Sequence, residues 1–305
     1  MNKLQAMEVF VQVVDAGGFT RAAEMMQLPK ASVSTLVQQL EQTLQVKLLH
    51  RTTRQVTVTA DGAAYYERCL RILLDVREAE ESLSHNRVSP SGRLRVDTMT
   101  AIAADIIIPA LPDFFERYPD IRLDLGGSER QVDLIEEGVD LAIRGGALND
   151  PNLIARRVGV MNFVTCATPG YLAKYGRPAH PNELSAHRAV NYFSSKTGKT
   201  YDWDFVRGDE RIDVPMPSCL AVNDTSMFMA ACLRDMGMVQ MPIYMAEPLV
   251  AEGKLQMILE DWGTSPVPIH VVYPQNRHLS AKVRVFVEWV AELFASDERL
   301  KLKRN

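Results

Sequence analysis

The fold of the N-terminal region is decided by the stretch FTRAAEMMQLPKASVSTLVQQLE at residues 19–41. Thr20 can open a short helix whose small residues Ala22 and Ala23 permit close packing, and Leu28-Pro29 interrupts it. A further helix is expected over residues 31–44, with a buried face formed by Val33, Leu36, Val37 and Leu40. Two short helices joined by a tight turn are typical of a helix-turn-helix.

The opposite face of the residue 31–44 helix is polar. Such side chains can hydrogen-bond to base edges and phosphates in a major groove. A solvated polar face is the alternative for any single helix, but the spacing of the two helices favours DNA binding. The predicted contact residues here are Thr20, Arg21, Lys30, Ala31, Ser32, Ser34, Thr35, Gln38 and Gln39.

Elements on both sides of this stretch complete a winged helix-turn-helix over residues 1–59. Apolar residues recur at helical spacing over residues 4–16, and Gly17-Gly18 ends that helix. Short β-like segments at residues 46–49 and 56–58 flank a predicted wing that meets the DNA backbone or minor groove. The wing residues are Arg51, Thr52, Thr53 and Arg54. Six basic and four acidic side chains lie in residues 1–60. This region therefore carries a small excess of positive charge, although the net charge of the whole chain is −4.

A long helix is expected over residues 60–86, with Thr59 as its N-cap. An apolar seam of period 3.5 indicates a dimerising coiled coil, although packing of a single amphipathic helix on its own domain is the alternative. The seam consists of Tyr65, Cys69, Ile72, Val76, Ala79 and Leu83. The Ser-Pro-Ser-Gly run within residues 87–92 is predicted to be a hinge.

From residue 93 to residue 305 the pattern changes to alternating strands and helices. Strands are expected at residues 94–98, 121–125 and 140–144, with helices at 101–118 and 132–137. Further strand-like runs follow to residue 273, and a last helix spans 281–294. This alternation predicts an α/β domain of parallel sheets with crossover helices.

The composition narrows the class of protein. Apolar residues make up 47% of the 305 residues and charged residues 24%, as in globular proteins. Four scattered cysteines and the absence of an apolar leader predict a cytosolic protein that binds no metal or other cofactor and contacts no membrane. The six histidines form no HExxH pattern, and GxSxG, GxGxxG and P-loop motifs are missing, so we expect no enzymatic activity.

These motifs together resemble the signature of LysR-type transcriptional regulators. The resemblance rests on Phe19–Ala23, Ser32–Ser34, Leu48–Arg54, Val58-Thr59 with Gly62, Gly92–Val96, Tyr118-Pro119, Asp133–Arg144 and Met236–Met238, and it spans nearly the whole chain. Residues 28–30 and 153–157 are similar to the subfamily that contains CrgA and AphB. Two positions depart from the family pattern: Gln45 replaces a glycine that commonly ends the recognition helix, and Thr35 stands where arginine is frequent.

The resemblance implies a homodimer or homotetramer that binds and bends dyad-symmetric double-stranded DNA, with RNA polymerase as a possible partner. It also implies a two-lobed effector domain like those of periplasmic binding proteins, in which lobe I comprises residues 93–163 and 267–297, and lobe II residues 164–266. A small-molecule effector is expected between the lobes, with a carboxylate as a candidate.

Two loops support this site from the residues themselves, because each places hydroxyls and backbone N–H groups at a helix N-terminus after a strand. Helix capping is the alternative role of these loops, and a surface ion pair is the alternative for Arg144. The predicted effector residues are Thr98, Met99, Thr100, Ser128, Arg144, Gly145, Thr165, Asn223, Asp224 and Thr225.

Other readings remain open at this point. Cys232 could make the protein a redox-sensing regulator, although a buried cysteine acting as a small apolar residue is the simpler role. A cytosolic solute-binding protein would explain the C-terminal two-thirds but leaves residues 1–86 without a purpose. An architectural DNA-binding protein would leave the C-terminal domain unexplained.

Overall fold

The computed structural model describes residues 2–51, 56–83, 90–130, 133–146, 150–275 and 279–301. The chain forms two compact units, Met1–Val88 and Ser89–Asn305, each with its own apolar core. No helix among these described residues is both long and apolar enough to cross a bilayer.

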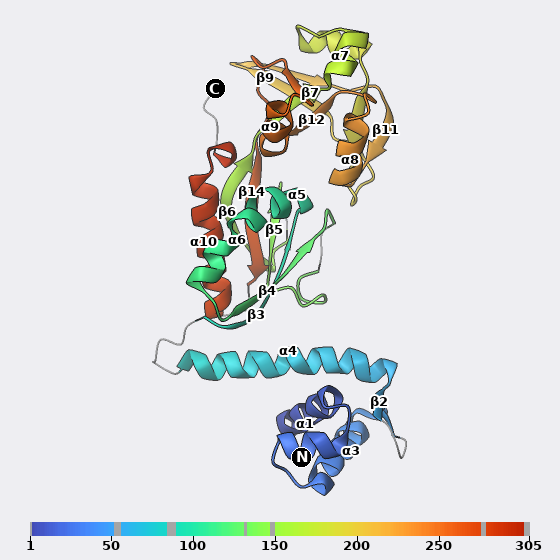
Figure 1. Cartoon of the computed structure of the whole chain (residues 1–305), viewed down its shortest axis with the longest axis vertical. Coiled ribbons are helices and arrows are strands. Elements are labelled where there is room, and N and C mark those ends of the chain that lie inside the picture. The colour runs from blue at the N-terminus through green and yellow to red at the C-terminus, as the bar shows by residue number, and fades with distance from the viewer. Residues whose placement is uncertain are drawn as a thin grey trace. The chain divides into compact units, whose positions relative to one another are not determined.

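Unit 1 is a winged helix-turn-helix followed by a long helix (Figure 1). Phe10, Val33, Val37 and Leu40 are fully buried between α1 and α3, so the apolar face predicted for residues 31–44 is confirmed. The two short strands pair antiparallel. The elements are α1 (Lys3–Asp15), α2 (Phe19–Met25), α3 (Lys30–Leu44), β1 (Leu49–Arg51), β2 (Val56–Val58) and α4 (Ala60–Leu83).

The start of α4 is tied to the hairpin. Thr59 Oγ1 accepts a hydrogen bond from the Gly62 amide at 2.8 Å and donates one to Lys47 O at 2.7 Å, which confirms the predicted N-cap. Cys69 is fully buried and Tyr65 packs beside it in the core of unit 1, whereas Ile72 is 39% exposed. The first part of the predicted seam therefore serves the core of its own unit, as in the single-helix alternative, and pairing of the rest stays a prediction.

Unit 2 begins with a lobe built on a five-stranded sheet of order β4-β3-β5-β14-β6. Strands β4, β3 and β5 are parallel, and β14 runs antiparallel to both β5 and β6. The strands are β3 (Gly92–Thr98), β4 (Ile121–Gly127), β5 (Leu141–Gly145), β6 (Leu153–Met161) and β14 (Val267–Pro274).

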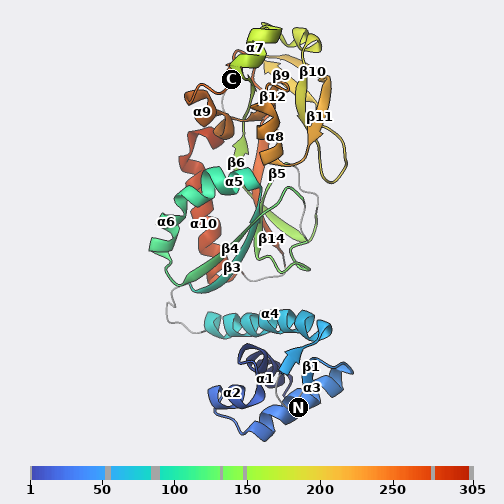
Figure 2. The same ribbon diagram turned by 45° about the vertical axis from the view of Figure 1, so that its right-hand side comes forward.

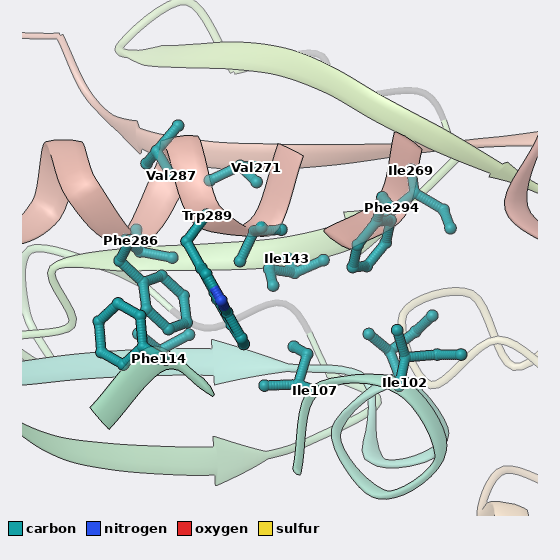
Figure 3. Close-up of a cluster of buried hydrophobic side chains, with 14 of the residues drawn as sticks. Ile102, Ile107, Phe114, Ile143, Ile269, Val271, Phe286, Val287, Trp289 and Phe294 are labelled. Atoms are coloured by element: carbon teal, nitrogen blue, oxygen red, sulfur yellow. The ribbon is translucent and has the colours of Figure 1, made fainter. Parts of the chain in front are cut away.

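Helices α6 and α10 cover one face of this sheet, and their aromatic side chains form the centre of its core (Figure 3). The ring centroids of Phe114 lie 5.3 Å from Phe286 and 5.0 Å from Trp289. Trp289 Nε1 donates to Asp113 Oδ2 at 3.0 Å, which satisfies the indole N–H. The helical segments are α5 (Thr100–Ile102), a π-helical turn (Ala103–Ile107), α6 (Ile108–Arg117), α10 (Ala281–Ser296) and a 3-10 turn (Glu298–Leu300).

The second lobe of unit 2 holds smaller sheets with helices beside them (Figure 2). Its central strand β7 (Phe163–Ala167) pairs antiparallel with β12 (Val239–Pro242) and β13 (Gln256–Ile258). The remaining elements are α7 (Pro169–Tyr175), a 3-10 turn (Pro181–Ala186), β8 (Ala189–Tyr192), β9 (Trp203–Arg207), β10 (Glu210–Val214), β11 (Ser218–Val222), α8 (Thr225–Cys232) and α9 (Ile243–Ala251).

Two expectations about this unit are wrong. Residues 133–138 form a single turn rather than a helix, because the Asp133 carboxylate accepts from the amides of Ile135 and Glu136, and Gly138 ends the turn at φ +65°. The five-stranded sheet is mixed rather than parallel, because β14 returns to it after the second lobe and runs antiparallel to both β5 and β6, and the β12-β7-β13 sheet is wholly antiparallel.

Candidate DNA-binding face and effector cavity

The polar face of α3 is accessible. This face is turned away from the core of unit 1, and Ser34 on it is half-buried. Its exposed residues are Lys30, Ala31, Ser32, Thr35, Gln38 and Gln39. Thr20 and Arg21 are exposed at the start of α2, which packs against α3. The structure thus brings the predicted contact residues of α2 and α3 onto neighbouring exposed surfaces. We refer to these exposed α3 residues together with Ser34 as the α3 face.

A buried carboxylate joins α3 to the hairpin. Glu41 is 3% exposed and accepts from the amides of Leu48 and Leu49 and from Lys47 Nζ at 2.8 Å. Burial alone would raise the pKa of Glu41, but these hydrogen bonds together lower it below its ordinary value. This fixes the start of β1 against the end of α3. The predicted wing residues Thr52, Thr53 and Arg54, and the Arg51 side chain, lie outside the described residues.

The two family departures have local consequences. Gln45 caps α3 in the left-handed region at φ +56°, where glycine is favoured. Thr35 turns its hydroxyl back along the helix and donates to Ala31 O at 2.8 Å, which occupies the hydroxyl proton.

Unit 2 contains a cavity of about 440 Å³ between its two lobes. This volume is within the range of small-molecule sites. Its lining is rich in aromatic and methionine side chains, with a few polar groups. From the first lobe come Met99, Ala101, Glu129, Gly145, Gly146 and Met161; the second lobe and the crossing strands contribute Phe163, Val190, Tyr192, Tyr201, Asp202, Trp203, Asp204, Thr225, Phe228, Gln240, Pro242, Tyr244, Met245, Ser265 and Val267.

Three of the predicted effector residues line this cavity, namely Met99, Gly145 and Thr225. Thr98 and Thr165 are instead buried within strands β3 and β7. The remaining predicted residues lie close to the cavity in sequence but are not in its lining: Thr100, Ser128, Arg144, Asn223 and Asp224.

Both helix N-termini that suggested an anion site already hold a carboxylate of the protein. Asp224 caps α8 by accepting from the Met227 amide at 2.9 Å. Glu129 accepts from the Thr100 amide at 3.3 Å and lies 3.5 Å from Thr225 Oγ1. Burial raises the pKa of Glu129, and the bond from Thr100 opposes that rise. The capping alternative is therefore the observed role of Asp224.

Arg144 is engaged inside the first lobe. Its guanidinium forms a buried ion pair with Asp97, and its Nη1 donates to Ile143 O at 3.1 Å. Ser128 Oγ also donates to Asp97, at 3.1 Å. The side chains of Arg144 and Asp97 are 9% and 12% exposed. Arg144 is thus an internal partner of Asp97 and is not directed at a ligand in the cavity.

Comparison with known proteins gives matches along nearly the whole chain. Residues 4–63 match the model of the bacterial regulatory helix-turn-helix protein, lysR family, and residues 87–295 match the LysR substrate binding domain. An HTH-type transcriptional repressor of Pseudomonas aeruginosa is 42% identical over 302 residues, which cover 99% of this chain and 95% of the relative.

The chain belongs to the LysR family of transcriptional regulators.

Solved structures agree with this assignment. The structure of CrgA from Neisseria meningitidis is 34% identical, with a TM-score of 0.60 over 94% of this chain and 97% of CrgA. The Vibrio cholerae virulence activator AphB is 27% identical, with a TM-score of 0.58 over 95% of this chain and 99% of AphB. This LysR-family protein is therefore a DNA-binding regulator with an effector-binding domain, as its resemblance predicted.

Cys232 does not have the environment of a reactive thiol in this LysR-family protein. Its side chain is fully buried in an apolar cluster with Cys166 and Phe228. Burial raises the pKa of the Cys232 thiol to about 12, so the nucleophilic thiolate is scarce near neutral pH. The structure favours the role of a small apolar residue.

Sequence reasoning missed most of the cavity of this LysR-family protein. Glu129 directly follows the predicted Ser128, and Phe228 lies one turn beyond Thr225, so neighbouring positions gave a signal for both. Tyr201, Trp203 and Tyr244 carried no such signal, because they reach the cavity only through the folding of the second lobe.

Proposed function

We propose that this protein regulates transcription in the cytoplasm by sequence-specific binding of dyad-symmetric DNA, under control of a small molecule held in the unit 2 cavity. The observation that carries the proposal is the α3 face, which is polar and accessible while the other side of α3 is anchored in the core of unit 1. A helix with these two faces fits the docking of a recognition helix in a major groove.

Dimerisation through α4 would place two α3 faces in successive major grooves, and a tetramer would join two such dimers. Ile72, exposed on α4, is available for this pairing. An effector that binds one arrangement of the lobes more tightly than another shifts the population of the assembly toward it. That shift would change DNA bending and contact with RNA polymerase.

The experiment starts from DNA selected from a random pool by the full-length protein, followed by gel shifts at several salt concentrations. We expect Gln38→Ala to reduce the preference for the selected sequence about tenfold or more, since a bidentate base contact contributes about 1–3 kcal/mol. Ser34→Ala should reduce it by a smaller factor, because a serine hydroxyl makes a single contact. Binding to unrelated DNA should change little.

Gln5→Ala is the matched control, because Gln5 is an exposed residue of α1 outside the α3 face. It should retain the preference of the unaltered protein. Unchanged footprints for both α3 variants, with α3 still folded by circular dichroism, would contradict the assignment of this face to base recognition.

A further inference from the structure

The charged side chains that line the unit 2 cavity are all acidic. They are Glu129, Asp202 and Asp204, and no lysine, arginine or histidine occurs among the described residues of the lining. Two arginines outside the lining are paired with carboxylates, of which Asp204 belongs to the lining and Asp97 and Asp213 do not. Arg144 pairs with Asp97, and Arg211 lies 3.1 Å from Asp213 and 3.7 Å from Asp204. The local field therefore favours a cation and opposes an anion.

Aromatic side chains line the same cavity as these carboxylates. Tyr192 and Phe228 meet edge to face at a centroid distance of 5.6 Å, and the Tyr192 hydroxyl is buried with its hydrogen-bonding capacity unused. The faces of aromatic rings attract organic cations. Six aromatic residues line the cavity: Phe163, Tyr192, Tyr201, Trp203, Phe228 and Tyr244.

The positions that would receive a ligand carboxylate are occupied. Asp224 takes the N-terminus of α8, and Glu129 takes the Thr100 amide in the first lobe. An anionic ligand would have to displace these groups and lie beside their charges. A cationic group placed at Glu129 would instead neutralise a carboxylate that burial makes costly to ionise.

We infer that the effector of this cavity is an organic cation, with a protonated or quaternary amine at Glu129 and an aromatic or compact apolar body among the rings. The inference rests on the proposed effector role of the cavity and replaces the carboxylate suggested by the sequence. Asp202, an exposed residue of the lining, adds a further negative charge.

A matched set of three probes tests the inference on the full-length protein by isothermal titration calorimetry. Tyramine, 4-hydroxyphenylethanol and 4-hydroxyphenylacetate share one aromatic body and carry a cation, a neutral group and an anion. We expect tyramine to bind at least about tenfold more tightly than the alcohol. The acid should bind more weakly than the alcohol.

Variants locate the preference in the cavity. Glu129→Gln should remove most of the tenfold advantage of tyramine over the alcohol. Glu116→Gln, an exposed position on α6 outside the cavity, should leave both affinities unchanged. Asp202→Asn is a second test at an exposed residue, where folding is not at risk, and should reduce the advantage by a smaller factor.

The inference is overturned if tyramine does not bind, if the alcohol or the acid binds as tightly, or if the advantage of tyramine survives both the Glu129 and Asp202 substitutions. Gel shifts with the selected DNA are measured in parallel. If the protein shows no preference for the amine but still recognises the selected DNA, only the inference of a cationic effector is rejected. If the amine binds but sequence-specific DNA binding is not found, the proposed regulatory function is rejected.

Discussion

At the residue scale, Gln45 shows how a side chain can cost stability without losing any contact. It ends α3 at φ +56°, ψ +28°, a conformation that brings the Cβ atom of an L-residue close to a carbonyl oxygen. Glycine has no Cβ and reaches this conformation freely. The left-handed turn itself is retained, since the Val46 amide still donates to Glu41 O at 3.2 Å.

Gln45→Gly should therefore stabilise unit 1 by about 1 kcal/mol. Gln42→Gly is the matched control, because the same substitution inside α3 removes helix propensity and should destabilise the unit by a similar amount. Urea denaturation followed by circular dichroism measures both. If both variants changed the free energy of unfolding in the same direction, the backbone at residue 45 would not be strained by its side chain.

Residue-scale reasoning from sequence succeeded where a side chain acts locally. Thr59 was identified as an N-cap, and the buried positions of α3 followed from their helical spacing. It did not separate residues that face the cavity from their neighbours: Met99 lines the cavity, whereas Thr98 is fully buried in the strand before it. The direction of a side chain near a strand end depends on the exact register of the sheet, which a local pattern does not fix.

At the scale of elements, the ion pair of Asp97 and Arg144 links β3 to β5 within the first lobe of unit 2. Removing one partner of a buried pair leaves the other charge without compensation. Arg144→Ala should lower the stability of unit 2 by about 3–5 kcal/mol, because Asp97 would keep only the hydrogen bond from Ser128 among the contacts described.

An exposed pair in the same sheet provides the comparison. Arg93 contacts Asp124 across β3 and β4, and their side chains are 51% and 43% exposed. Arg93→Ala should cost no more than about 1 kcal/mol, because water screens such pairs. Denaturant unfolding of both variants measures the difference, and similar losses would contradict a structural role specific to the buried pair.

The length of a helix and the order of strands in a sheet were predicted less well from the sequence. The helix expected at residues 132–137 had a suitable apolar spacing, but the Asp133 side chain and Gly138 confine it to one turn. The mixed sheet order could not be predicted from strand spacing, since β14 enters the sheet of the first lobe after the whole second lobe has been traversed. The cavity has the same origin, because Glu129 and Trp203 come from different lobes.

At the scale of the whole molecule, the chain is divided into two units that are stabilised by separate cores. A substitution that strains one core should then act on one unfolding transition only. Gly62 offers such a substitution in unit 1, since a Cβ atom there would lie 2.1 Å from Leu48 O and 2.9 Å from Val58 Cγ1. The hairpin would have to move away from the start of α4.

We expect scanning calorimetry of the full-length protein to resolve two transitions. Gly62→Ala should lower the melting temperature of unit 1 by several degrees, because overpacking costs about 1–3 kcal/mol and each kcal/mol shifts a domain of this size by about 4–8 °C. Gln5→Ala, at an exposed position of α1, should leave it within about 2 °C. Arg144→Ala should lower only the transition of unit 2. If Gly62→Ala and Arg144→Ala each displaced both transitions equally, the two units would unfold as one. Effector binding in the cavity would then act on the α3 face through the shared stability of the two units rather than through a rearrangement of folded units.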